Sequence, residues 1–78
     1  MKIYVGNLPI GTSNADLKEL FSAFGEVTSA YVTKTKFSGH SRGFGFVEML
    51  QEYGDRAVSD LNGQQIDCMV LRVHEARA

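Results

Sequence analysis

Three aromatic side chains in two short segments are the residues of this sequence best suited to chemistry. Tyr4 precedes Val5, and Phe44 and Phe46, separated by one glycine, precede Val47. Because successive side chains of a β-strand point to opposite faces, the three rings should face away from a core that receives the two valines. Large rings clustered on the surface of a small chain indicate a binding site. They predict a platform on which nucleic-acid bases can stack.

Other side chains share this face by the same alternation. Tyr31 lies between two apolar residues in a strand-like segment, and Lys2 lies two positions before Tyr4. Arg72 and His74 alternate with apolar residues near the end of the chain. The expected platform therefore has a further ring and several basic or polar side chains around it.

The sequence contains few residues that are candidates for catalysis or metal binding. The two histidines, His40 and His74, fall in a loop-like segment and on an outer strand, with no evident nucleophile between them. The lone Cys68 cannot form an internal disulfide or a metal-binding pair, so we expect it to be a packing residue. No glycine-rich loop opens a helix to hold a phosphate. We therefore expect neither an enzyme nor a bound metal or cofactor.

The elements that position these residues follow from the hydrophobic pattern. Ser13 and Asp16 have the spacing of a capping box at the start of a helix, and Gly25 is expected to end it. Phe21, Phe24 and, on the second helix, Tyr53 are spaced as core residues. Strands are expected at 3–5, 26–34, 43–49 and 70–74, and helices between residues 13 and 25 and over 51–61.

Two helices can cover only one face of a sheet. The order of elements thus predicts an α+β sandwich of the ferredoxin-like βαββαβ type. Its four-stranded antiparallel sheet should carry both helices on one face, with the first and third strands adjacent and central. The other face should be left for solvent or a partner.

Length and charge limit the kind of protein. The 78 residues suffice for one domain, over 1–78, and are too few for two. The net charge of −1 and the pI near 6.0 are not the strongly basic balance expected of a nucleic-acid binder. A basic sheet face opposite acidic helices would resolve this difference. The basic residues expected on that face, its rim or the loop beside it are Lys2, Lys34, Lys36, Arg42, Arg72 and Arg77.

The sequence also gives an expectation about location. No apolar stretch approaches the roughly 18 residues of a membrane span, and the first residues lack the features of a signal peptide. A single cysteine fits a reducing compartment. We expect a cytoplasmic chain that does not enter membranes, and a monomer is favoured.

Two motifs resemble those of a known family. The segment IYVGNL at 3–8 resembles the hexapeptide signature of the RNA recognition motif, and RGFGFVEM at 42–49 resembles its octapeptide. The resemblance covers the whole chain and looks closest to the short single-motif RNA-binding proteins of bacteria. It implies that Tyr4, Phe44 and Phe46 stack on bases or sugars and that Arg42 contacts phosphate.

The expected function is binding of single-stranded RNA, with single-stranded DNA as a further candidate, by a post-transcriptional regulator or an RNA chaperone. The alternative is a protein-interaction module that uses the same aromatic face. Gly43 and Gly45 oppose that alternative if they keep the sheet open for a flat base. The candidate RNA-binding residues are Tyr4, Phe44, Phe46, Arg42, Lys2, Tyr31, Arg72 and His74.

Overall fold

The computed structural model describes residues 1–9, 11–33, 43–66 and 68–76. Six of its eight elements form the main fold, and two very short strands precede the last one. In chain order they are β1 (Lys2–Leu8), α1 (Asn14–Ser22), β2 (Val27–Thr33), β3 (Gly43–Met49), α2 (Gln51–Leu61), β4 (Gln65–Ile66), β5 (Met69–Val70) and β6 (Arg72–Glu75). Within these described parts of the chain, no helix is long and apolar enough to span a membrane.

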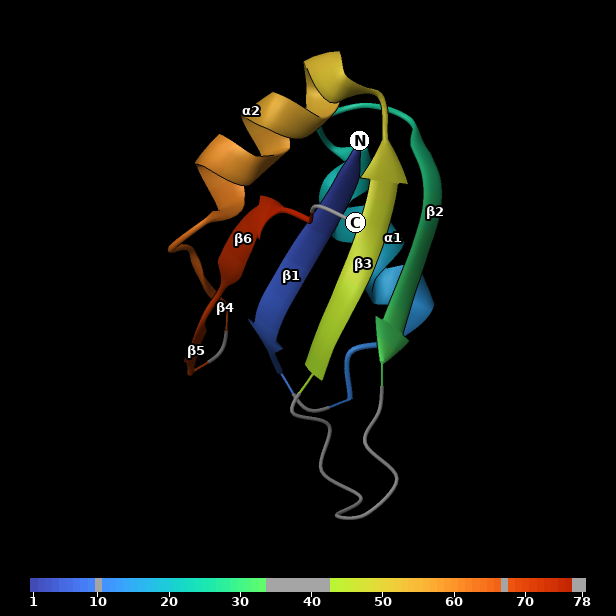
Figure 1. The fold of residues 1–78 in the computed structure, drawn as a ribbon. Coiled ribbons are helices and arrows are strands. Elements are labelled where there is room, and N and C mark those ends of the chain that lie inside the picture. The colour runs from blue at the N-terminus through green and yellow to red at the C-terminus, as the bar shows by residue number, and fades with distance from the viewer. Residues whose placement is uncertain (10, 34–42, 67, 77–78) are drawn as a thin grey trace.

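The main sheet has the strand order β2-β3-β1-β6, and all three neighbouring pairs are antiparallel. Both helices pack on one face of this sheet, and α1 lies behind the sheet in the view of Figure 1. The predicted α+β class, the βαββαβ order and the central position of the first and third strands are confirmed. One face of the sheet is therefore left uncovered by helices.

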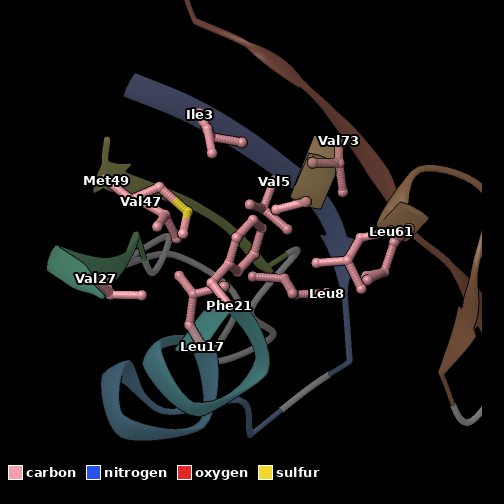
Figure 2. Packing of buried hydrophobic residues seen from close by; sticks show 12 residues of the cluster. Ile3, Val5, Leu8, Leu17, Phe21, Val27, Val47, Met49, Leu61 and Val73 are labelled. Carbon is pink, nitrogen blue, oxygen red and sulfur yellow. The ribbon is translucent and has the colours of Figure 1, made fainter. Parts of the chain in front are cut away.

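The core lies between the sheet and the two helices. Phe21 of α1 is completely buried and sits among the strand side chains in Figure 2. The valines used to orient the strands, Val5 and Val47, are also at 0% exposure. The alternation of these two strands is thus as predicted. The buried hydrophobic residues are Ile3, Val5, Leu8, Leu17, Phe21, Val27, Val47, Met49, Ala57, Leu61, Leu71 and Val73.

The first strand is longer than predicted. The sequence suggested a turn after Val5, but β1 continues to Leu8 through an irregularity in its pairing with β3. Asn7 adopts a left-handed backbone, with φ of 63°, at this irregularity. Asparagine tolerates that conformation better than most residues. Its side-chain amide donates a 2.7 Å hydrogen bond to the carbonyl of Val70, so it ties β1 to β5.

The start of α1 is the predicted capping box. The Asp16 backbone amide donates to the Ser13 hydroxyl at 3.0 Å, and the Ser13 amide donates to the Asp16 carboxylate at 3.1 Å. The hydrogen bond from the Ser13 backbone amide to the carboxylate, followed by the interaction of the Ser13 hydroxyl with it, lowers the pKa of Asp16 below its ordinary value. The helix ends at Ser22, before the predicted stop at Gly25.

Ser13→Ala should raise the pKa of Asp16 part of the way back toward 3.8, because only the hydroxyl's contribution is lost. A carboxylate with a lowered pKa stabilises the fold above its unfolded pKa, and this contribution disappears as pH falls through the folded pKa. Carboxyl carbon NMR shifts over an acid titration measure this change directly. Equal Asp16 midpoints in the two proteins would mean that the hydroxyl does not act on this group.

The prediction that Tyr53 is a core residue is wrong. Its side chain is 38% exposed, whereas Gly54 and Ala57 are the buried residues of that part of α2. Gly54 leaves room for the side chain of Met1, so the helix approaches the sheet at this small residue. Tyr53 instead covers Gly25, where a β-carbon would collide with its ring.

The segment before the last strand contains a small hairpin that the sequence did not reveal. Gln65 pairs with Val70, and Ile66 with Met69, in a two-stranded ladder apart from the main sheet. The predicted last strand is accordingly divided, since Val70 belongs to β5 and β6 begins at Arg72.

Asn62 connects the end of α2 to the outer edge of β6. Its side-chain oxygen accepts a 3.0 Å hydrogen bond from the amide of Val73. Asn62→Ala should therefore lower the free energy of unfolding by about 1 kcal/mol, because the amide loses its acceptor. Asn62→Asp retains an acceptor and is the matched control in urea denaturation. An alanine variant as stable as the parent would show that water replaces the asparagine without loss.

Candidate nucleic-acid interface

Four ring side chains lie side by side across the uncovered face of the sheet. The β-pairing places Tyr31 opposite Phe46, Phe46 opposite Tyr4, and Tyr4 opposite His74. Each ring comes from a different strand, in the order β2, β3, β1 and β6. We call these four residues the aromatic row. Directly opposed side chains are the closest neighbours that a sheet offers, so the row is continuous from one edge of the sheet to the other.

The rings of the row are in contact with one another. The centroid of Tyr31 is 5.6 Å from that of Phe46, and Phe46 is 5.9 Å from Tyr4. Tyr4 and His74 are closer, at 4.8 Å, and their planes differ by 26°, a stacked arrangement. These distances are within the range of favourable aromatic pairs. The rings thus support each other's orientation without any ligand.

Phe44 adds a fifth ring, two positions before Phe46 on β3. Its centroid is 6.0 Å from Tyr4 with planes 28° apart, and 6.1 Å from Phe46 with planes at 90°. Together with the aromatic row it forms the aromatic platform. Tyr4 and Phe46 share the centre of this platform, since each of them contacts three other rings.

The platform is only partly exposed. Tyr4, Phe44 and Phe46 are half-buried by their mutual contacts, so the expectation that the three rings stand freely in solvent is wrong in degree. Tyr31 at one end is 43% exposed, and His74 at the other is also exposed. A flat ligand would cover ring surface that water still reaches, without opening the core.

Positive charge accompanies the rings. The Lys2 ammonium lies 4.8 Å from the centroid of Phe46, within cation–π range. Lys2 is also directly opposite Glu48, and Arg72 is exposed on β6. Arg42 lies outside the described residues, as do the other basic residues expected near the sheet, Lys34, Lys36 and Arg77.

The helices carry the opposite charge balance. Asp16 and Glu19 lie on α1 with one lysine, and α2 has three acidic residues and Arg56. Arg56 makes an exposed ion pair with Asp60 at 3.7 Å. The helices therefore carry the acidic side of the expected separation of charge, and of the basic side the structure describes only Lys2 and Arg72.

The glycines of β3 have a different role from the one predicted. Gly43 and Gly45 are buried, and a β-carbon on Gly45 would lie 2.6 Å from the Tyr31 carbonyl oxygen and 2.9 Å from Leu17 of α1. A β-carbon on Gly43 would lie 2.8 Å from that of Leu8, a buried residue. They allow α1 and β1 to approach β3 closely, on the core side. They therefore say nothing about whether the open face accepts a base.

Within residues 1–9, 11–33, 43–66 and 68–76, no three histidine, cysteine, aspartate or glutamate side chains are grouped so that they could hold a metal ion. Cys68 is exposed, so its expected packing role is wrong. It lies in the connection between the two short strands, which the sequence did not identify as a hairpin.

The chain is similar to known proteins in both sequence and fold. The family model of the RNA recognition motif matches residues 3–72. A 31 kDa chloroplast ribonucleoprotein of Nicotiana sylvestris is 46% identical over 76 residues, which cover 96% of this chain and 24% of that protein. The mitochondrial glycine-rich RNA-binding protein 4 of Arabidopsis thaliana is 38% identical, with 96% and 56% covered.

Solved structures show the same architecture. The crystal structure of the RNA-binding protein PG1 has a TM-score of 0.88 and 44% identity, covering 97% of this chain and 93% of that one. The Rna15 domain with bound GU RNA has a TM-score of 0.86 and 26% identity, covering 99% and 83%. The chain spans only about a quarter to a third of the length of the first curated relatives that it matches.

The expectation of a cytoplasmic location is wrong. The relatives that contradict it are chloroplast ribonucleoproteins and a mitochondrial RNA-binding protein. A fold of this kind packs in the same way in either compartment, so its core and its surface pattern do not indicate where the protein is located.

Proposed function

The chain belongs to the RNA recognition motif family, and from this we propose that residues 1–78 form one such domain, which binds single-stranded RNA by stacking bases on the aromatic platform. The observation that carries the proposal is the aromatic row, to which each of the four strands contributes one ring. A duplex hides the faces of its bases, whereas an unpaired strand can splay them onto such rings. The domain binds its ligand and does not transform it.

Each ring has its own part in the proposal. Tyr4, Phe44 and Phe46 are the principal stacking residues, because they form the contiguous centre of the platform. Tyr31 and His74 extend it to both edges of the sheet. Stacking is worth about 1–3 kcal/mol per base and tolerates every base. Two or three stacked bases therefore give moderate affinity with little sequence preference of their own.

The basic side chains supply the remaining contacts. Lys2 and Arg72 flank the platform on β1 and β6, and Arg42, in the family's octapeptide, is the third residue proposed to contact phosphate. Phosphate contacts fix the path of the strand without selecting its sequence. A regulator of RNA after transcription and an RNA chaperone are the two roles that we propose for a protein with such a domain, since both require binding of single-stranded RNA.

An amide NMR titration with a mixed-sequence RNA of about eight nucleotides tests the proposal. Shifts should be centred on the platform and should be nearly absent from the outer surface of α2. The DNA oligomer of the same sequence, run in parallel, reports whether the 2′-hydroxyls matter. A folded domain without shifts at high RNA excess would favour the protein-interaction alternative, for which the same exposed rings would be the docking surface.

Binding should weaken with salt, but mildly. About three phosphate contacts to a single strand predict a slope near −2 in a plot of log association constant against log salt concentration. Fluorescence anisotropy at several potassium chloride concentrations measures this slope. Arg72→Gln should reduce its magnitude by about 0.7. A slope near zero in the parent chain would exclude the proposed phosphate contacts.

A further inference from the structure

Gly6 is a glycine on the uncovered face of the sheet. It lies two positions after Tyr4 on β1, and its cross-strand partner is Arg72. Although no helix covers this face, Gly6 is buried. The group that covers it is the Tyr4 ring: a β-carbon on Gly6 would lie 2.6 Å from the Tyr4 hydroxyl oxygen, 2.8 Å from Cε1 and 3.0 Å from Cζ. The ring therefore leans along its own strand and occupies the space that a side chain at Gly6 would need.

Backbone geometry does not explain the glycine. Among the residues that the structure describes, φ is positive at Asn7, Gly11, Gly25 and Gly63 and not at Gly6. An alanine could thus adopt the conformation of Gly6 without the strain of the left-handed region. The three atoms nearest to its β-carbon would all belong to the flexible Tyr4 side chain. At Gly45, by contrast, the nearest atom is a backbone oxygen that cannot move aside.

The direction in which Tyr4 leans decides what it meets. In this position its ring stacks on His74 at 4.8 Å and lies 6.0 Å from Phe44, nearly parallel to both. Both contacts involve neighbours on the adjacent strands β6 and β3. If a side chain at Gly6 displaced the Tyr4 ring, the angles of that ring to His74 and to Phe44 would both change.

We propose that Gly6 is a positioning residue for RNA binding: its missing side chain lets the Tyr4 ring lie along β1, in the orientation that completes the aromatic platform. This inference rests on the proposed function, since it concerns the same face. In this proposal Gly6 does not itself contact RNA. It affects RNA affinity only by setting the position of the Tyr4 ring.

A double-mutant cycle of Gly6→Ala and Tyr4→Ala tests this directly in the full chain. Tyr4→Ala should weaken binding of the eight-nucleotide RNA at least about fivefold, and Gly6→Ala about three- to tenfold. The double variant should bind no more weakly than Tyr4→Ala alone, because the effect of Gly6 disappears with the ring. Gly6→Val, with a bulkier side chain, should bind more weakly than Gly6→Ala.

Two readouts without RNA complete the test. Urea denaturation should give Gly6→Ala nearly the stability of the parent, and nuclear Overhauser contacts between the Tyr4 and His74 rings should weaken. Unchanged RNA affinity in Gly6→Ala, or a loss that persists in the Tyr4→Ala background, would overturn the positioning role. If Tyr4→Ala itself bound RNA like the parent, the stacking proposal would fail instead, so the two failures are distinguishable.

Discussion

The double variant Phe44→Ala, Phe46→Ala should bind single-stranded RNA about thirtyfold more weakly than the parent chain, or worse, while remaining folded. Each stacked base contributes about 1–3 kcal/mol, so removal of two rings costs about 2 kcal/mol at least. The fold should survive because both rings are half-buried on the uncovered face and contact mainly other platform rings. Fluorescence anisotropy gives the affinity, and the amide NMR spectrum shows whether the variant is folded.

Tyr53→Ala is the matched control for this experiment. Tyr53 is also an exposed aromatic residue, 38% accessible, but it lies on α2 over Gly25 and not on the platform. Its removal should leave RNA affinity unchanged. If the double Phe variant were folded and bound RNA as tightly as the parent, stacking on β3 would be excluded as the source of affinity. A similar loss from Tyr53→Ala would place the RNA elsewhere on the molecule.

The strand alternation is the part of the site that the sequence predicts well. A valine that must be buried fixes the face of its neighbour, so Val5 and Val47 were enough to orient Tyr4 and Phe46. The parity of Tyr31 was correct for the same reason. The alternation of side chains does not, however, predict the register in which neighbouring strands pair. That Tyr31 and His74 lie in one line with the central rings depends on how three pairs of strands align, which the structure supplies.

Other errors arose where two side-chain patterns competed. Tyr53 and Gly54 are adjacent on α2, and helical spacing alone favoured the larger, apolar residue as the buried one. Close packing of Met1 against the helix instead requires the small residue there. Similarly, Gly43 and Gly45 were interpreted from the rings beside them in sequence, although their own missing side chains face the core. The short ladder after α2 has only two residues on each strand, too few for a period to be visible.

Phe21→Ala should destabilise the fold by about 3–5 kcal/mol. Phe21 is completely buried between α1 and the sheet, and deletion of its ring leaves a cavity that its neighbours cannot fill. A domain of this size has a total stability of about 4–12 kcal/mol, so the variant loses a large share of it. Urea denaturation followed by circular dichroism measures the loss. Val47→Ala, which removes less of the same core, should cost about 1–3 kcal/mol and keeps the comparison possible if Phe21→Ala does not fold.

Phe46→Ala is the informative partner of Phe21→Ala, because the same atoms are deleted on opposite faces of one sheet. The ring of Phe46 is half-buried and touches Tyr4, Tyr31 and the Lys2 ammonium, all on the uncovered face. We expect removal of the Phe46 ring to cost little stability and much RNA affinity. Phe21→Ala should instead cost much stability, and the molecules that remain folded should bind RNA nearly as well as the parent. Two phenylalanines with equal effects on stability would mean that the platform is part of the core, and stacking energy would then have to be separated from folding energy for every ring of the face.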